Sequence, residues 1–288
     1  MRLCEDRVVI VTGAGRGIGR AHALAFAATG ARVVVNDLSP GPASEVAELI
    51  GPRAVVNTED VGTWSGAERV VDAAVNAFGR LDVLVNNAGI VRDRMLVSCG
   101  EDEWDEVVRV HLKGHFAPLH HAAAHWRGVH KAGGGVSGRV INTSSGAGLF
   151  GSVGQANYSA AKAGIAAMTL VAAAELARYG VTVNAIAPAA RTRMTEQTFA
   201  ATMTPPEHGF DAMAPENVSP LVVWLGSEEA AGVTGRVFEV DGGRICVVHG
   251  WRRGPEVDKG ARWAPEELGG VVRDLVAADD PVPVYGAE

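Results

Sequence analysis

The sequence is poor in cysteine, in aromatic residues and in positive charge. Cys4, Cys99 and Cys246 are odd in number, far apart and without C-x-x-C spacing. This argues against a disulfide framework or a zinc ribbon and is typical of a reduced cytosol. The formal net charge is -7 and the 26 basic residues are scattered. Nucleic acid and other polyanions are therefore not expected as partners.

Long hydrophobic runs are also missing. The first residues, M-R-L-C-E-D-R, carry acids and no apolar stretch, so they do not resemble a signal peptide. The Ala-rich run over residues 160–177 comes closest to the roughly 18 apolar residues of a membrane span, but Lys162 and Glu175 interrupt it. We expect a soluble, cytoplasmic protein with no membrane partner, and 288 residues suffice for one large core.

A tyrosine and a lysine lie four positions apart at the head of an Ala-rich helix predicted over Asn157–Tyr179. This spacing is about one helical turn, so Tyr158 and Lys162 share a face, and the ammonium group would lower the pKa of the phenol. Ser145, at the end of a strand, could hold a substrate oxygen against Tyr158. The three groups suit proton transfer at an alcohol or ketone. A tyrosine and a lysine at this spacing are usually only surface residues. The catalytic interpretation therefore depends on the other motifs of the chain.

A glycine-rich loop, G-A-G-R-G-I-G, lies between the predicted strand Arg7–Thr12 and the predicted helix Arg20–Ala28. Glycine permits a tight turn and close approach of the backbone to a pyrophosphate, and the helix N-terminus offers N–H groups to the anion. This setting predicts a dinucleotide site. Its predicted cofactor-binding residues are Gly13, Gly15, Arg16, Gly17, Ile18 and Gly19.

The second predicted strand, Arg32–Asn36, ends beside Asp37. A carboxylate there would accept hydrogen bonds from an adenosine ribose and repel a 2′-phosphate, which favours NAD. Arg16 favours the opposite choice, since an arginine could pair with that phosphate. We give Asp37 more weight because its carboxylate acts directly at the ribose, and we place Leu38 with it in the cofactor site.

Strands and helices alternate along the chain, and about seven strands are expected. This order predicts an α/β fold, a Rossmann-type doubly wound parallel sheet, in a domain over residues 1–243. Residues 244–288 form an extension, with a strand and a helix over Pro265–Ala277, that packs on this domain or on a neighbouring subunit. The other predicted strands are Ala54–Asn57, Leu81–Asn86, Gly138–Thr143, Val181–Ile186 and Val237–Val240, and the other helices are Ser65–Phe78, Glu101–Val129 and Glu216–Leu225.

Loops that leave the third and fourth strands supply further cofactor-binding candidates. Such sheets bind ligands at the carboxyl edge, where small residues let a cofactor lie against the backbone. An N-N-A-G segment alone is as often only a turn. The candidates are Asp60, Val61, Asn87, Ala88 and Gly89.

Six of the nine histidines fall within His111–His130. A metal site is one interpretation, but no carboxylate lies among them at helical spacing, Pro118 interrupts the segment, and nothing resembles H-E-x-x-H. We expect ordinary packed or solvated histidines and no metal.

The chain between Pro188 and Pro215 is irregular yet carries large apolar side chains. Methionine is an adaptable filler, so this segment is interpreted as a lid that covers the cofactor and lines an apolar pocket, with packing of a short helix as the alternative. The apolar residues are Met194, Phe199, Met203, Phe210 and Met213.

The motifs T-G-A-G-R-G-I-G, N-N-A-G, Ser145, Y-S-A-A-K and V-D-G-G occur in this order over residues 7–243, and together they resemble the short-chain dehydrogenase/reductase family. The resemblance implies that Ser145, Tyr158 and Lys162 are catalytic. It also implies that Tyr158 and Lys162 contact the cofactor, with Lys162 holding the nicotinamide ribose. Pro188 and Thr192 would contact the nicotinamide, although Pro188-Ala189 replaces a family P-G.

One departure from the family pattern is informative. The family usually has a fourth catalytic member, an asparagine in N-x-x-G, where this chain has His111 in H-L-K-G. Together with I-A-P-A-A-R-T-R-M-T-E and P-L-V-V-W-L, the H-L-K-G motif makes the chain resemble the (3R)-hydroxyacyl-CoA dehydrogenase part of multifunctional enzymes type 2. These enzymes are also described as 17-beta-hydroxysteroid dehydrogenases. That implies a small lipophilic substrate, a CoA thioester.

Two other functions stay open at this point. One is a hydroxysteroid or other lipophilic alcohol dehydrogenase that needs no CoA, and the other is a dinucleotide-binding protein without turnover. Broad Ala-rich faces on the helices around residues 101–129 and 157–179 predict a homodimer or homotetramer.

Overall fold

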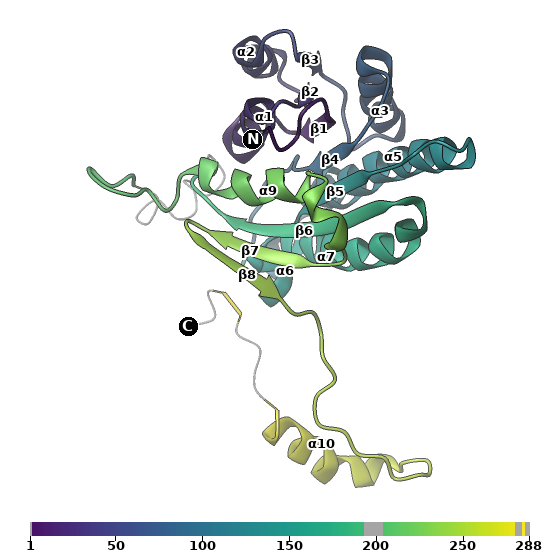
Figure 1. Ribbon diagram of the computed structural model, residues 1–288. Helices are drawn as coiled ribbons and strands as arrows, with labels where there is room; N and C mark the ends of the chain where they lie inside the picture. The colour runs from purple at the N-terminus through teal and green to yellow at the C-terminus, as the bar shows by residue number, and fades with distance from the viewer. Residues whose placement is uncertain (1, 193–203, 280–283, 286–288) are drawn as a thin grey trace.

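A twisted sheet of eight strands forms the centre of the computed structural model, which describes residues 2–192, 204–279 and 284–285 (Figure 1). The strand order is β3-β2-β1-β4-β5-β6-β7-β8. Seven strands are parallel, as predicted, and β8 (Arg244–Val248) is antiparallel to β7 (Val237–Asp241). These seven strands agree with the number expected for the domain, and β8 is the further strand expected in the extension. The added strand is antiparallel because only Gly242 and Gly243 separate it from β7, a linker that allows a hairpin but no crossover.

The central parallel strands are buried along their whole length because helices cover both faces of the sheet. Every residue of β1 (Val8–Thr12), β4 (Val83–Asn86) and β5 (Gly138–Thr143) is buried. The other strands are β2 (Arg32–Asn36), β3 (Ala54–Asn57) and β6 (Val181–Ala189). The bounds of β2, β3 and β5 are those predicted from the sequence.

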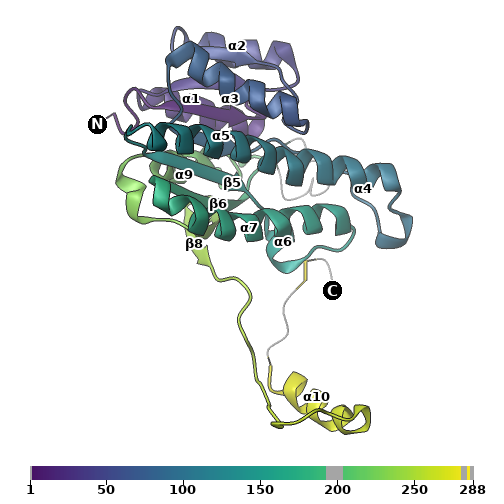
Figure 2. The same ribbon diagram turned by 90° about the vertical axis from the view of Figure 1, so that its right-hand side faces the viewer.

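Two layers of helices enclose the sheet. One layer holds α1 (Gly17–Ala28), α2 (Pro40–Ile50) and α9 (Ser219–Leu225), which pack their apolar residues into one core cluster. In the other layer α3 (Trp64–Phe78), α5 (Gly114–Lys131) and α7 (Ala156–Leu176) lie side by side, as Figure 2 shows. Short 3-10 turns occupy Leu96–Ser98, Ala177–Tyr179, Pro215–Val218, Glu229–Gly232 and Pro265–Glu267.

The helical region expected over Glu101–Val129 is divided by a π turn. It consists of α4 (Glu101–Val108), a π-helical turn over Arg109–Lys113, and α5. We expected Pro118 to interrupt the segment, and this is wrong, because Pro118 lies inside α5. The helix continues through it just after the π turn, where the regular hydrogen-bond pattern is already broken.

One helical stretch among the described residues, Ala156–Tyr179, is long and apolar enough to cross a membrane by length and composition. It belongs to the core, however, because Lys162, Ile165 and Thr169 are buried where α7 covers the sheet.

The extension leaves the body after β8 and carries α10 (Leu268–Ala277), which stands apart from the sheet in both views (Figures 1 and 2). Its Leu268, Val272 and Val276 are exposed. The expectation that the extension packs on this domain or on a neighbouring subunit stays a prediction. The chain returns to the body at Tyr285, which forms an isolated β-bridge with Ser152.

Candidate active site

The parallel sheet brings the predicted site residues to one edge. β1, β4, β5 and β6 are neighbours that point the same way, so the segments that follow them leave from the same carboxyl edge. These segments are the glycine loop after Thr12, the N-N-A-G loop, the stretch that starts at Ser144, and the chain beyond Ala189. Residues from distant parts of the sequence thus converge, as expected for the ligand-binding edge of such a sheet.

Thr12 and Asn87 fasten the glycine loop to the N-N-A-G loop. The Thr12 hydroxyl accepts hydrogen bonds from the backbone N–H groups of Asn87 (2.9 Å) and Ala88 (3.0 Å). The Asn87 amide donates to the carbonyl oxygen of Thr12 at 2.9 Å. That Asn87 binds the cofactor stays a prediction, and its side chain fastens the loop that would cradle the cofactor. Thr12 was missed as a site residue, although it opens the motif T-G-A-G.

The glycine loop has the bare backbone that a pyrophosphate needs. A Cβ added at Gly13 would lie 2.9 Å from the Cα of Ala88, and one at Gly19 would lie 2.1 Å from the oxygen of Gly13. Within the described residues, no side chain caps the start of α1, where Arg16 is the exposed N-cap residue. The amides of its first turn therefore remain available to an anion. The residues present fit a dinucleotide.

Asp37 lies directly against the glycine loop. Its carboxylate accepts hydrogen bonds from the backbone N–H of Gly15 (3.0 Å) and of Ser39 (2.9 Å). Leu38 beside it is exposed. The structure thus places the Asp37 carboxylate at the end of β2 and next to the glycine loop. This is the position where we expect the adenosine ribose of the cofactor.

Asp60 and Val61 have side-chain roles within the protein. The carboxylate of Asp60 pairs with Arg109 at 2.7 Å and accepts from the backbone N–H of Gly62 at 2.8 Å. The side chain of Val61 is buried in the core. That Asp60 and Val61 bind the cofactor stays a prediction, and because both side chains are engaged within the protein we expect this contact to come from the backbone of the loop.

The chain beyond β6 lies over the start of α1. The methyl group of Thr192 is 3.5 Å from the position of a Cβ on Gly17, and Pro188, which follows the buried part of β6, is partly buried. Arg191 forms an ion pair with Asp211. Within the predicted lid, Met194, Phe199 and Met203 lie outside the described residues, while Phe210 is exposed and Met213 is partly buried.

Ser145, Tyr158 and Lys162 meet at the end of β5. Ser145 is the N-cap of α6 (Gly146–Phe150), and its hydroxyl accepts from the backbone N–H of Ala147 at 3.2 Å. A side-chain hydrogen bond joins Ser145 to Tyr158. α6 was not predicted, since a five-residue segment with two glycines has little helical signal. The predicted serine–tyrosine pair is nevertheless formed.

Lys162 is buried beneath the tyrosine. Its ammonium nitrogen donates to the carbonyl oxygen of Thr143 at 2.6 Å and lies 5.5 Å from the centre of the Tyr158 ring. Burial lowers the pKa of Lys162 to about 7. Burial also raises the pKa of Tyr158, partly offset by its hydrogen bond to Ser145. We expected Lys162 to lower the pKa of the Tyr158 phenol. Without a bound cofactor the pKa is instead raised, because desolvation by burial has a larger effect on it than the nearby ammonium group.

His111 reaches the ring of Tyr158 from the π turn. Its Nε2 lies within hydrogen-bond distance of the Ile90 backbone N (3.0 Å) and O (2.6 Å), and the tautomer decides which bond forms. Burial lowers the pKa of His111 to about 3, so the ring is neutral. Single π turns inside helices often mark functional sites. The predicted fourth site residue is thus brought to the catalytic group. Across the described chain, no three His, Cys, Asp or Glu residues gather as a metal site would require.

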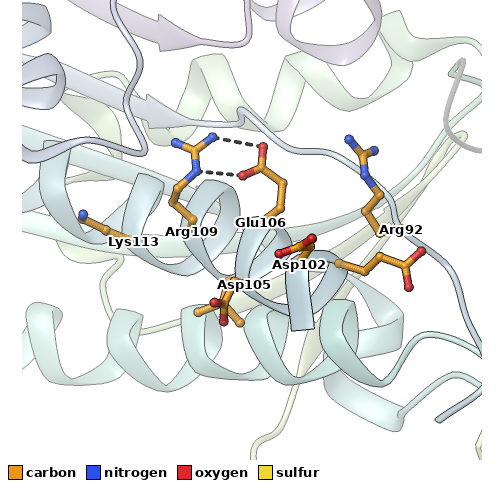
Figure 3. Close-up of a pocket in the computed structure, with 8 residues that line it drawn as sticks. Arg92, Asp102, Asp105, Glu106, Arg109 and Lys113 are labelled. Carbon is orange, nitrogen blue, oxygen red and sulfur yellow. Dashed lines mark hydrogen bonds and ion pairs between the residues drawn. The ribbon is translucent and has the colours of Figure 1, made fainter. Parts of the chain in front are cut away.

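An open, charged hollow with a cavity volume of about 740 Å³ lies along α4, beside this site (Figure 3). Figure 3 shows Arg109 bonded to Glu106 through two of its nitrogens, and the same guanidinium reaches Asp60. The hollow therefore borders the cofactor loop through Arg109. None of Ser145, Tyr158 and Lys162 lines it. Its lining residues are Arg92, Asp102, Glu103, Asp105, Glu106, Val108, Arg109 and Lys113.

Comparison with known proteins gives consistent matches. A family model described as short chain dehydrogenase matches residues 7–202. Hydroxyacyl-CoA dehydrogenase ChsB1 of Mycobacterium tuberculosis is 46% identical, over 98% of this chain and 92% of its own length. Peroxisomal multifunctional enzyme type 2 of Mus musculus is 42% identical over 86% of this chain, which spans 33% of that protein. A crystal structure of a short chain dehydrogenase from Mycobacterium avium is 62% identical, with a TM-score of 0.92 over 99% of this chain and 100% of that one.

Proposed function

The chain belongs to the short-chain dehydrogenase family, and from this premise we propose that it is an NAD-dependent enzyme that oxidises a 3-hydroxyacyl-CoA to the 3-oxoacyl-CoA or runs the reverse reduction. The meeting of Ser145, Tyr158 and Lys162 beside the glycine loop carries this proposal. Relatives named as a hydroxyacyl-CoA dehydrogenase and as a peroxisomal multifunctional enzyme support the choice of a thioester over other secondary alcohols.

In the proposed reaction the chain supplies proton transfer and orientation, and bound NAD would accept the hydride from the alcohol carbon. Tyr158 is the general base that takes the hydroxyl proton while the carbon–oxygen double bond forms. Ser145 orients the same oxygen by a hydrogen bond. In the reverse direction Tyr158 returns the proton, so the atoms balance either way.

Lys162 serves this chemistry from its buried position. Its protonated form favours the phenolate of Tyr158 through the attraction of opposite charges. Because the pKa of Lys162 is lowered to about 7, the group changes charge near neutral pH. Oxidation needs the phenolate, whose pKa is raised by burial, so the oxidation rate should increase with pH as long as Lys162 keeps its proton.

The cofactor choice rests on Asp37. A carboxylate bonded to Gly15 of the loop would face a 2′-phosphate with like charge, which favours NAD over NADP. Arg16 is exposed at the start of α1. Gly13, Gly15, Gly17 and Gly19 would hold the pyrophosphate, as proposed from the sequence.

The test is NADH formation by purified protein with NAD and matched panels of 3-hydroxyacyl-CoA esters and free steroid alcohols. Preference for thioesters supports the proposal. Turnover of free sterols alone would identify a lipophilic alcohol dehydrogenase that needs no CoA. Absence of turnover on both panels, with NAD still bound, would identify a dinucleotide-binding protein.

We further propose that the protein works in the cytoplasm as a homodimer or homotetramer. The exposed apolar residues of α10 support self-association, because an isolated ten-residue helix is not stable in water. Docking on a second copy would cover them and stabilise the helix.

A further inference from the structure

The loop that joins α6 to α7, residues 151–155, carries a second segment of chain along one side. This loop connects the catalytic serine to the catalytic tyrosine. Arg94 forms a parallel β-bridge with Gln155, and its backbone N–H donates to the carbonyl oxygen of Gly154 at 2.8 Å. The sulfur of Met95 lies 3.9 Å from the position of a Cβ on Gly154. The segment after the N-N-A-G loop is thus held against the catalytic loop.

The C-terminal extension lies along the other side of the same loop. Tyr285 forms a parallel bridge with Ser152, and its carbonyl oxygen accepts from the N–H of Val153 at 2.9 Å. Val284 lies 3.5 Å from the position of a Cβ on Gly151. Three segments far apart in the sequence, around residues 94, 153 and 285, therefore form one small ribbon.

This ribbon and the turn that follows Arg94 expose a set of apolar side chains. Leu96 is 75% exposed and Val97 is 94% exposed, while the other members are about half exposed. Exposed apolar side chains that gather in one place usually mark a binding site. We call this set the apolar rim, and it consists of Met95, Leu96, Val97, Val153, Val284 and Tyr285.

The rim is continuous with the catalytic serine. The ring of Tyr285 lies 2.8 Å from the position of a Cβ on Gly146, the residue directly after Ser145. The same ring meets Phe150 at the far end of α6, with centroids 5.9 Å apart. A ligand held by its oxygen at Ser145 and Tyr158 therefore has this surface beside it as it extends outwards.

The charged groups next to the rim are already paired. The guanidinium of Arg94 forms an ion pair with Glu103 at 3.0 Å, and the carboxylate of Asp93 accepts from the amide of Gln155 at 3.1 Å. The surface thus offers apolar contacts rather than charge to a ligand. It fits a hydrocarbon chain or ring better than the phosphates of a coenzyme.

We propose that the apolar rim binds the apolar acyl part of the substrate, and that Tyr285 is a specificity residue supplied by the C-terminal extension. The proposal rests on the proposed function, since it assumes a substrate whose alcohol oxygen lies at Ser145. Each methylene that becomes buried on the rim adds roughly fourfold to the affinity. Long acyl groups should therefore react with a higher kcat/KM than short ones.

The experiment compares 3-hydroxybutyryl-CoA with 3-hydroxypalmitoyl-CoA for the wild type and for L96D, V97D and Y285A. Leu96 and Val97 are largely exposed and Tyr285 is half exposed, so the fold should be kept, which thermal unfolding verifies. We expect kcat/KM for the long ester to fall at least tenfold and that for the short ester to change less than twofold. V257D is the matched control, because Val257 is also half exposed but lies in the extension away from the rim. It should change neither value.

An unchanged ratio between the two esters, or an equal loss on both, overturns the proposal. So does a lower mass in solution for L96D than for the wild type, because the rim would then be an interface between copies. If the wild type oxidises neither ester, the proposed function has failed, and the rim is tested by calorimetric binding of palmitoyl-CoA. Weaker binding by L96D supports the rim, and equal binding overturns it.

Discussion

The imidazole of His111 meets the phenol of Tyr158 edge to face, with ring centroids 5.1 Å apart and planes at 87°. The ring is buried and neutral, so it adds no charge beside the base. Its Nε2 is held at the backbone of Ile90, which follows the N-N-A-G loop. His111 thus links the predicted cofactor loop to the ring of Tyr158, and we predict that it acts on the reaction by positioning this ring.

Substitution of Gly89 should disturb this link. A Cβ at this position would lie 2.5 Å from Cε1 of His111, so G89A must move the imidazole away from its present place. We expect kcat to fall by roughly 10- to 100-fold, because displacement of about 1 Å near reacting groups has effects of this size. Steady-state kinetics would measure it. G128A in α5, where no atom lies within 4 Å of the new Cβ, should keep full activity.

Removal of the phenol oxygen tests the general base. Y158F should lower kcat by about 10²- to 10⁴-fold, the range for loss of a positioned proton acceptor, while the affinity for NAD stays close to wild type. Kinetics with equilibrium binding of NAD would separate the two. Y179F, at the end of the same helical stretch, is the control. Unchanged turnover in Y158F would show that our mechanism is wrong.

Replacement of Asp37 should change the cofactor preference. D37S removes the carboxylate that would repel a 2′-phosphate, so the ratio of kcat/KM for NADP over NAD should rise by at least tenfold. The variant also loses the hydrogen bond to Gly15, so thermal stability is measured in parallel. R16A should alter the ratio much less. A larger shift from R16A than from D37S would reverse our ranking of the two residues.

Acid should destabilise the protein in a defined pH window. Burial lowers the pKa of His22 and His111 to about 3, and that of His115 well below its ordinary value. Between about pH 6.5 and pH 3 the unfolded chain binds protons that the native state does not. The free energy of unfolding therefore falls with decreasing pH by up to about 1.4 kcal/mol per pH unit for each histidine.

Denaturant titrations across this range would measure the slope. H22N can retain the contact that Nδ1 makes with the Ser219 hydroxyl at 2.9 Å, but asparagine does not titrate. The free energy of unfolding of this variant should therefore depend on pH less steeply, by the contribution of one histidine. An equal slope in the variant would show that His22 is not neutral in the native state.

Negative charge introduced on the apolar face of α10 should weaken self-association. Val272 and Val276 are exposed and one turn apart, so V272D combined with V276D should weaken docking on a second copy. Light scattering coupled to size exclusion should then report a smaller mass than for the wild type. R273A on the same helix is the control and should keep the wild-type mass. A wild type that is already monomeric at all concentrations would contradict the prediction.

The strands and the meeting of Ser145, Tyr158 and Lys162 could be predicted because their signals are local. β2 and β5 are short apolar runs that end where polar residues or glycines follow in the sequence. Tyr158 and Lys162 are one helical turn apart. α2 was missed because its start, Pro-Gly-Pro, looks like a turn although proline suits the first helical turn.

Long-range placement accounts for the remaining differences. That Asn87 bonds to Thr12, or that Tyr285 lies beside Gly146, depends on the packing of distant segments and leaves no pattern in the nearby sequence. The balance of pKa effects at Tyr158 and Lys162 likewise depends on how deeply both groups are buried. The spacing of two residues in the sequence shows that their side chains can meet. It does not show how far burial desolvates them, which determines their pKa values.

The extension is fastened to the body at both ends, by β8 and by Tyr285. It is therefore a closed loop and not a free tail, which limits the conformational entropy that α10 would lose on docking. Tension applied to α10 by a neighbouring protomer would reach the ribbon beside Ser145 without passing through the sheet. Assembly and substrate selection would then be mechanically coupled.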